Sequence, residues 1–244
     1  MSPAPPPTFR TTLLEPTGLH PLIRLTFQSS SARPYVSCGL HAYLTLPSAV
    51  FLDKYQLSSP NLLASKNLRG LRSLIGEADL EAPEWTLTKW GSTVLLELSP
   101  PLTERSPWLA DIPLHVRYVD ESPLEYSHTS SEYANITIPW PVVFWACPTD
   151  VDGKLSVNPF DRKDLGFDRL FAARTQFYHF QPSGLSTRVM GISIPFLSLE
   201  HATSVERLSM LGIIGGFLWI CLALWRQAPS TRGEASKKDD REIR

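Results

Sequence analysis

Two acidic residues, Asp150 and Asp152, have the spacing of a carboxylate pair that could hold a divalent cation. Residues two apart in a strand point to the same side, and many sugar-nucleotide-dependent glycosyltransferases hold Mn²⁺ or Mg²⁺ with this D-x-D pattern. The sequence does not match a calcium loop of the EF-hand type. Counted from Asp150, its fifth position would be Lys154 in place of an oxygen ligand, and its twelfth would be Asp161 in place of Glu. Since Gly153 follows Asp152 and Asp-Gly is typical of turns, we interpret this sequence as a turn.

Other catalytic and metal-binding motifs are absent from the sequence. It contains no G-x-G-x-x-G or G-x-x-x-x-G-K-[ST] phosphate loop, no G-x-S-x-G nucleophile elbow, and no C-x-x-C or H-E-x-x-H pattern. The six histidines are dispersed, with no pair at i and i+4 and no cysteine at ligand spacing. They are His20, His41, His115, His128, His179 and His201. The sequence therefore predicts no catalytic residue, no cofactor and no metal site.

Two cysteines and one asparagine are candidates for covalent modification. Cys38 and Cys147 lie in predicted strands, whereas the third cysteine, Cys221, lies in an apolar segment. In an oxidising compartment Cys38 and Cys147 could form a disulfide that bridges two sheets; otherwise they would be small buried thiols. Asn135 begins the sequence Asn-Ile-Thr, which is an N-glycosylation acceptor if this region is lumenal.

The apolar segment near the C-terminus predicts a transmembrane helix over residues 205–226. Eighteen uncharged residues, 208–225, lie between Arg207 and Arg226. As a helix they span about 27 Å, which matches a thin bilayer such as that of the endoplasmic reticulum. A buried core helix is the alternative, but a helix that is apolar all round is atypical of a soluble domain of this size. Gly212 and Gly216 would let another helix pack closely, although glycine is also common in membrane helices.

The flanking charges predict the orientation of this helix. Residues 226–244 contain six basic and four acidic residues, whereas residues 200–207 contain one basic and two acidic residues. Because short cytosolic flanks are enriched in Lys and Arg, we expect a cytosolic tail and a lumenal N-terminal region. Residues 1–12 contain no apolar signal-peptide segment. Either translocation uses the C-terminal helix, or the sequence begins late.

The region before this helix is predicted to be a mainly β, antiparallel sandwich. Twenty-two of the 244 residues are proline, which interrupts helices. Apolar runs of strand length, several with period two, alternate with turn residues. The stretch from Asn61 to Ile75 has leucines at helical spacing and is predicted to be a helix. The predicted strands cover residues 22–27, 35–46, 50–57, 85–90, 93–98, 112–119, 142–147, 175–180 and 187–194.

Four segments follow from these patterns. We expect a flexible N-terminus (1–17), a lumenal β-rich domain (18–204), the transmembrane helix (205–226) and a cytosolic disordered tail (227–244). The formal net charge of −1 lacks the surplus of cations that a general nucleic-acid binder needs, so no nucleic-acid partner is expected.

Six parts of the chain are similar to one known family. They are Gly18-Leu19-His20 with Pro21 to Phe27, Cys38, Leu46 to Leu57, Ile112 to Tyr118, Pro141 to Cys147 and the apolar helix. These segments resemble the PIG-X family, the small endoplasmic-reticulum subunit of glycosylphosphatidylinositol (GPI) mannosyltransferase I, in its fungal form. The resemblance covers about residues 18–225, and longer fungal relatives carry an extra N-terminal region, which favours a truncated gene model or a compact form.

The resemblance implies a non-catalytic, single-pass protein of the endoplasmic reticulum membrane. In the family, a lumenal domain binds and stabilises PIG-M, the multi-spanning enzyme that transfers the first mannose from dolichol-phosphate-mannose to the GPI precursor. The expected partners are thus a PIG-M-type catalytic subunit and membrane lipids. Because the catalytic carboxylates belong to PIG-M, the resemblance weighs against a role for Asp150 and Asp152. The alternatives are a lumenal chaperone-like protein with broader clients, or a lumenal glycosyltransferase that uses Asp150 and Asp152.

Overall fold

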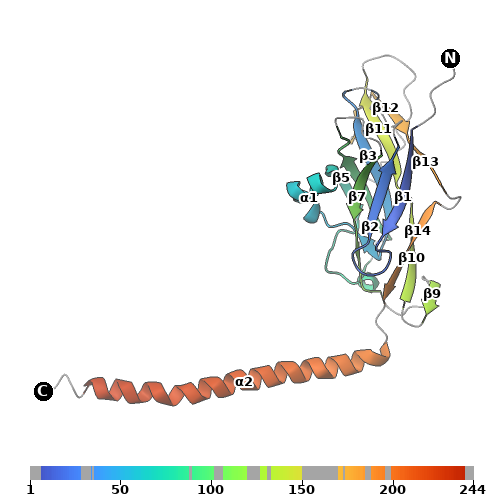
Figure 1. Cartoon of the computed structure of the whole chain (residues 1–244). Coiled ribbons are helices and arrows are strands. Elements are labelled where there is room, and N and C mark those ends of the chain that lie inside the picture. The colour runs from blue at the N-terminus through green and yellow to red at the C-terminus, as the bar shows by residue number, and fades with distance from the viewer. Residues whose placement is uncertain are drawn as a thin grey trace, which may run out of the picture. The chain divides into compact units, whose positions relative to one another are not determined.

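The structure is a computed structural model that separates into two compact units, residues 1–196 and residues 197–244 (Figure 1). The first unit is built mainly of strands, and the second contains a long helix. This arrangement confirms the predicted fold class, mainly antiparallel β with a C-terminal apolar helix. The residues that the structure describes are 7–28, 34, 36–87, 90–101, 107–119, 127–130, 133–149, 170–172, 174–184, 188–195 and 199–239.

The strands of the first unit form two larger and two smaller sheets. Neighbouring strands are antiparallel except for β1 and β13, which are parallel. The four-stranded sheet, in the order β13-β1-β2-β7, contains β1 (Thr8–Leu14), β2 (Leu22–Phe27), β7 (Trp108–Pro113) and β13 (Gln181–Pro182). The five-stranded sheet, in the order β12-β11-β3-β6-β5, contains β3 (Gly39–Pro47), β5 (Leu68–Gly76), β6 (Gly91–Leu98), β11 (Val142–Pro148) and β12 (Thr175–His179). The smaller sheets contain β14 (Val189–Pro195), β10 (Tyr133–Pro139) and β9 (Ser127–Ser130), and β4 (Val50–Phe51) paired with β8 (His115–Val116).

Alternation along the strands buries one face of each larger sheet in a shared core. In β2, Ile23, Leu25 and Phe27 are fully buried, while Arg24 on the other face forms an ion pair with Asp111 of β7. The carboxylate of Asp111 raises the pKa of Arg24 above its usual value through this hydrogen-bonded contact. Each large apolar side chain buried in the core stabilises the fold by about 1.5–3 kcal/mol.

The strand β1 lies within residues 1–17, which we expected to be a flexible N-terminus. It pairs with β2 along its length, from Phe9 opposite Phe27 to Leu14 opposite Leu22. Phe9 and Thr11 are buried, whereas Arg10 between them is exposed. This period-two pattern is short and is interrupted by polar threonines, which is why it did not stand out in the sequence.

The helix predicted over residues 61–75 is wrong for most of its length. Only α1 (Pro60–Ser65) is helical, and β5 begins at Leu68. The register of β5 against β6 shifts after Leu68 and again after Leu71, so residues three apart in β5 pair with residues two apart in β6. Each such bulge adds one residue to its strand, and two bulges give the leucines of β5 the spacing of a helix.

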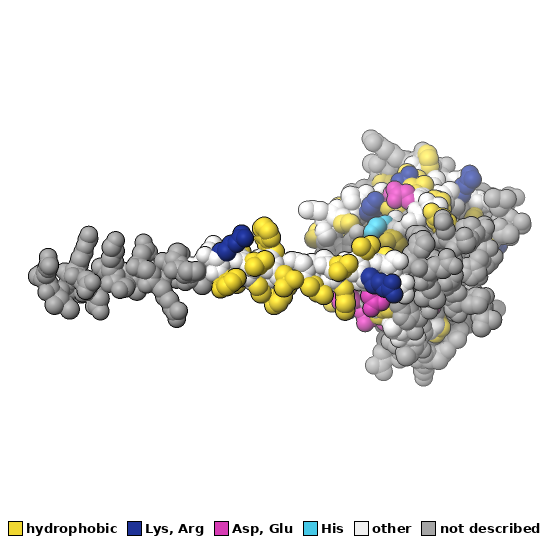
Figure 2. Space-filling view, turned by 90° about the horizontal axis from the view of Figure 1, so that it is seen from below, with side chains coloured by type: hydrophobic (Ala, Val, Ile, Leu, Met, Phe, Trp, Pro, Cys, Tyr) yellow, Lys and Arg dark blue, Asp and Glu magenta, His cyan; other side chains and the backbone are white. Residues whose placement is uncertain are grey.

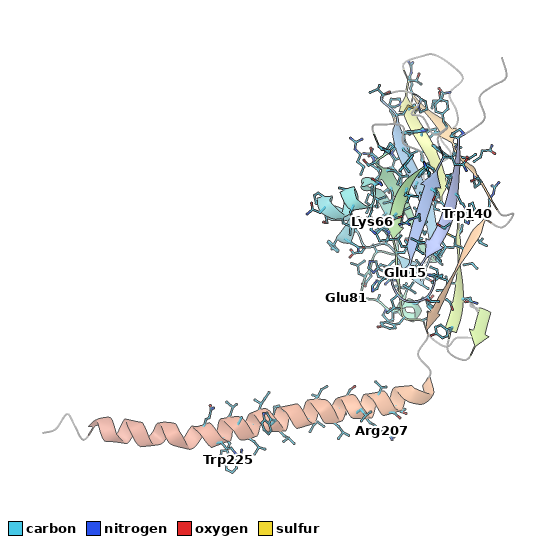
Figure 3. All side chains as sticks on the ribbon, viewed as in Figure 1. Glu15, Lys66, Glu81, Trp140, Arg207 and Trp225 are labelled. Carbon is cyan, nitrogen blue, oxygen red and sulfur yellow. A yellow bond between two sulfur atoms is a disulfide. The ribbon has the colours of Figure 1, made fainter. Side chains whose placement is uncertain are left out.

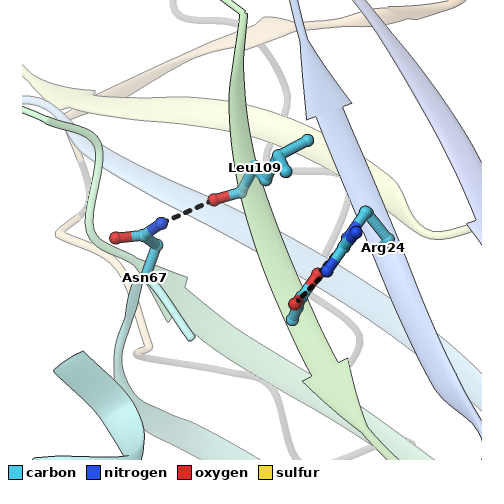
Figure 4. Close-up of polar contacts among 4 residues, drawn as sticks. Arg24, Asn67 and Leu109 are labelled. Atoms are coloured by element: carbon cyan, nitrogen blue, oxygen red, sulfur yellow. Dashed lines mark hydrogen bonds and ion pairs between the residues drawn. The ribbon is translucent and has the colours of Figure 1, made fainter. Parts of the chain in front are cut away.

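The turn between α1 and β5 connects the two larger sheets at one edge (Figure 4). Asn67 has a positive φ of 54°, a conformation that Asn tolerates better than most residues. Its side-chain amide donates a hydrogen bond of 2.8 Å to the carbonyl oxygen of Leu109 in β7. The backbone N–H of Asp111 donates a second hydrogen bond, of 3.0 Å, to the carbonyl of Lys66. The corner therefore fixes β5 against β7.

Cys38 and Cys147 form a disulfide in the structure, with the two Cα atoms 4.1 Å apart. Gly39 pairs with Ala146, so the two cysteines lie at the same end of the neighbouring strands β3 and β11. The disulfide therefore links adjacent strands of one sheet. Our prediction that it would bridge two sheets is wrong. Both cysteines are buried in the core.

The second unit consists of the helix α2 (Leu199–Asp239). Residues Thr203–Gln227 have a mean hydropathy of 2.1, so by length and composition this helix can cross a membrane. Figure 2 shows apolar side chains along it between basic side chains, and Figure 3 labels Arg207 and Trp225 on it. The helix extends to Asp239, into the tail that we expected to be disordered. The tail is rich in Ala, Glu, Lys and Arg, which are good helix formers.

Candidate interaction site

Three of the segments that carry the family resemblance meet at one end of the β domain. The backbone N–H groups of Leu114 and Val116 donate hydrogen bonds of 2.9 Å to the carbonyls of Pro21 and Leu19. The N–H of Arg117 donates a hydrogen bond of 2.8 Å to the carbonyl of Ala49, which precedes β4. The segments around residues 18–21, 46–57 and 112–118 therefore form one structural unit.

Two histidines lie in contact within this unit. The Nδ1 atoms of His20 and His115 are 3.0 Å apart, and Nε2 of His115 is 3.0 Å from Oε1 of Gln56. The ring of Phe51 stacks on His115 with centroids 5.3 Å apart. Because Gln56 Oε1 can only accept, Nε2 of His115 donates to it, and Nδ1 of neutral His115 accepts from His20. Burial lowers the pKa of His115, and the nearby His20 lowers it further, which favours this neutral form.

Arg117 holds two loops together next to the histidine pair. It is only 4% exposed, and its guanidinium carbon lies 4.4 Å from the ring centroid of Phe51. Its Nε donates a hydrogen bond of 3.1 Å to the carbonyl of Ser48, and Nη1 donates one of 2.7 Å to the carbonyl of Ala82. Burial lowers the pKa of Arg117, an effect that the nearby carboxylates of residues 77–84 oppose.

The loop over residues 77–84 is fixed to this unit at both ends. The backbone N–H of Glu77 donates a hydrogen bond of 2.9 Å to the carbonyl of Gly91, and the N–H of Glu84 donates one of 3.2 Å to the carbonyl of Tyr118. Gly91 has φ of 142°, and a Cβ there would lie 2.1 Å from the carbonyl oxygen of Leu46. Only glycine fits this close approach, so Gly91 allows the start of β6 to lie close to the end of β3.

Large aromatic side chains are exposed at this end of the domain. Tyr55 is 66% exposed, Tyr118 is 63% exposed and Trp90 is 57% exposed. Tyr55 precedes the short helix η1 (Gln56–Ser58), whose first residue contacts His115. Aromatic residues of this kind are enriched in protein interfaces, so the arrangement is typical of a binding surface. Within the described residues, no three His, Cys, Asp or Glu side chains gather as metal ligands.

A second polar cluster lies on the outer face of the five-stranded sheet. His41 of β3 is buried between the rings of Phe144 and Phe171. Its pKa is lowered from 6.5 to about 4, mainly by burial; the charge of Arg72 also lowers it, and the hydrogen bond with the carbonyl of Gly39 opposes the shift. A cavity of about 220 Å³ lies beside His41 and is lined also by Arg72 and Glu97. Glu97 forms ion pairs with Arg69 and Arg72, at 3.1 Å and 3.9 Å.

The structure places the predicted site residues in different parts of the chain. Asn135 is half-buried in β10, on the opposite face from the core residues Ala134 and Ile136. Gly212 and Gly216 lie in α2, and Asp150 and Asp152 lie outside the described residues. Asn135 does not belong to the unit around His115.

The contact between His20 and His115 was missed in the sequence. The two residues are 95 positions apart, and the histidines were judged only by their spacing along the chain. The sequence did contain a signal for this contact, because His20 and His115 both belong to segments that resemble the family. Arg117 and Gln56 belong to the same segments.

Comparison with known proteins supports that resemblance. The family model described as "PIG-X / PBN1" matches residues 16–225 of the chain. "Protein pbn1" of Aspergillus fumigatus is 40% identical over 257 aligned residues, which cover 96% of this chain and 51% of the relative. No solved structure matches the chain.

Other fungal relatives give the same result. "Protein pbn1" of Neurospora crassa is 43% identical, with 90% of this chain and 42% of the relative covered. "Protein PBN1" of Saccharomyces cerevisiae is 31% identical, with 85% of this chain and 43% of the relative covered. The chain thus spans about half the length of the curated relatives that it matches. The family match covers most of the chain, and the chain belongs to the PIG-X / PBN1 family.

Proposed function

We propose that this chain is a non-catalytic subunit that binds and stabilises a PIG-M-type mannosyltransferase, the enzyme that adds the first mannose to the GPI-anchor precursor. The observation that carries the proposal is the family match over residues 16–225, which supports a role in GPI-anchor biosynthesis. The β domain provides a surface for a partner, and the apolar stretch Thr203–Gln227 provides a membrane helix.

The proposed location is the endoplasmic reticulum membrane, with the β domain in the lumen and the C-terminal tail in the cytosol. The disulfide between Cys38 and Cys147 supports a lumenal domain, because disulfides persist in oxidising compartments. The excess of basic residues after the apolar helix supports a cytosolic tail. Asn135 is then on the side of the membrane where N-glycosylation occurs.

Stabilisation follows from mass action. A subunit that binds only the folded partner lowers the free energy of the folded state by RT ln(1 + [L]/Kd), which is about 2.7 kcal/mol when its concentration is 100 times Kd. This amount reduces the unfolded fraction of the partner about a hundredfold, and with it the supply to degradation. No catalytic step by this chain is needed.

Depletion of the chain from cells tests the proposal. We expect the steady-state amount of the PIG-M-type enzyme to fall, while unrelated multi-spanning proteins of the same membrane keep their abundance. Unchanged abundance of the enzyme would contradict the stabilising role. A fall of many unrelated membrane proteins would instead favour a chaperone with broad clients.

The glycosyltransferase alternative has its own test. Cells that carry Asp150→Ala together with Asp152→Ala should keep both GPI-anchored surface proteins and normal amounts of the PIG-M-type enzyme. Loss of GPI anchoring with normal amounts of both proteins would show that the two carboxylates take part in chemistry.

A further inference from the structure

The end of the domain around Arg117 carries an acidic aromatic surface, which we define as residues 53–55, 77–84, 90 and 118. Its parts are connected by the hydrogen bonds of Glu84 to Tyr118, of Glu77 to Gly91 and of His115 to Gln56. Figure 3 places Glu81 at the lower end of the β domain, away from β12 at the upper end. The exposed rings of Tyr55, Trp90 and Tyr118 belong to this surface.

The charge of this surface is negative, because its carboxylates outnumber its cations. It contains five carboxylates, and its only cation is Lys54, with Arg117 buried beneath. Among the described residues, Asp53, Glu77, Asp79 and Glu81 form no ion pair within 4.0 Å. Asp79 and Glu81 are exposed to solvent. A surplus of acidic groups next to exposed aromatic rings favours a partner segment that supplies Lys or Arg.

The buried guanidinium beneath this surface has one unsatisfied donor. Nη2 of Arg117 has less than 1 Å² of exposed area and no hydrogen-bond acceptor within the described part of the chain. A buried donor without an acceptor costs free energy, about 1–3 kcal/mol or more for a charged group. Arg117 carries this cost while its Nη1 donates a hydrogen bond to the carbonyl of Ala82 in the loop of residues 77–84.

The chain also leaves the domain at this end. The N–H of Ser193 donates a hydrogen bond of 2.8 Å to the carbonyl of Pro16, and the N–H of Gly18 donates one of 3.4 Å to the carbonyl of Ser193. Ser193 is three residues before the last residue of the domain, and Gly18 is two residues before His20. The histidine pair and the last strand of the domain therefore share one end.

We propose that the acidic aromatic surface docks a basic lumenal segment of the catalytic mannosyltransferase. This inference rests on the proposed function and names the surface that performs it. A bilayer is the other class of occupant, but the negative charge gives this surface no attraction to anionic lipids. Tyr and Trp are the residues most often found to dominate binding at protein interfaces.

Co-purification of the full chain with the catalytic mannosyltransferase tests the surface. The variant Tyr55→Ala with Tyr118→Ala should recover at least about tenfold less enzyme than wild type, because truncation of aromatic anchors usually costs at least that factor. The matched control, Tyr55→Phe with Tyr118→Phe, keeps the rings and should recover about as much as wild type. Equal recovery by both variants would overturn the proposal, and it is also the result expected if the rings contact lipid.

A second variant tests the charge. Asp79→Lys with Glu81→Lys should reduce recovery more than Asp79→Asn with Glu81→Gln, and wild-type recovery should fall as salt is raised. Salt-independent recovery that charge reversal leaves unchanged would overturn the electrostatic part. In every variant, a urea denaturation midpoint equal to that of wild type verifies that the domain is folded. If the wild-type chain recovers no enzyme, the proposed function is wrong. If wild type recovers the enzyme and the variants recover the same amount, the function stands and only the choice of surface is wrong.

Discussion

Removal of the disulfide should destabilise the β domain strongly. The bond joins residues 109 positions apart, so it closes most of the domain into one loop. With a loop of that length, the chain-entropy model gives a loss of about 16 cal/mol/K, or about 4.8 kcal/mol at 25 °C. Disulfides measured in proteins contribute about 2–5 kcal/mol, so we expect Cys38→Ser with Cys147→Ser to lose at least about 2 kcal/mol.

Urea denaturation of the full chain in detergent, followed by tryptophan fluorescence, measures this loss. Trp145 in β11 is buried in the core that contains the disulfide, so its emission reports unfolding of the domain. Cys221→Ser is the matched control, because this free cysteine lies exposed in α2 and should leave the denaturation midpoint unchanged. A loss below about 1 kcal/mol in the double variant, with the oxidised bond verified in wild type, would refute the reasoning.

Three further predictions concern pH, the buried arginine and the glycan. In the folded protein the pKa of His41 is about 4, against the ordinary 6.5. As pH falls, His41 is therefore protonated in the unfolded chain before it is protonated in the folded one. The free energy of unfolding should drop by roughly 2 kcal/mol between pH 7.5 and pH 5. His41→Phe should flatten the dependence of the urea midpoint on pH, and an unchanged slope would contradict the assignment. Arg117→Lys should lower the free energy of unfolding by about 2 kcal/mol, since an ammonium cannot reach both carbonyls, whereas exposed Arg10→Lys should have little effect in the same urea titration. Asn135→Gln should abolish a mobility shift of the wild-type protein on endoglycosidase treatment, and a wild-type protein that shows no shift would contradict a glycosylated lumenal site.

The strands with clean alternation and the apolar helix could be predicted from the sequence. The run Leu22–Phe27 has three apolar residues at period two, and it is β2 with the predicted bounds. The apolar stretch between Arg207 and Arg226 lies within α2. In both cases the decisive property is local, because one period or one length identifies the element.

The stretch after α1 could not be assigned correctly because the decisive property is the partner strand. Bulges after Leu68 and Leu71 are forced by the register with β6. They give a strand the three-residue spacing of a helix, and a single sequence does not show which strand lies opposite. The same limit applies to Cys38 and Cys147, whose pairing within one sheet depends on the register of β3 with β11.

The candidate site was hidden for a related reason. His20, Gln56, His115 and Arg117 come from three segments, and they meet only because β4 pairs with β8 and the segment before β2 pairs with the chain after β7. Spacing along the sequence carries no information on such contacts. The resemblance to a family pointed to these segments, although not to the contacts between them.

The proposed function requires that this chain forms a complex with a PIG-M-type mannosyltransferase. The most direct measurement is to purify the full chain from its own membranes in mild detergent and to identify the proteins that remain with it in stoichiometric amounts. We predict that the mannosyltransferase is recovered at about one copy per copy of this chain. Recovery of the chain alone, or with a varied set of unrelated membrane proteins, would contradict the account.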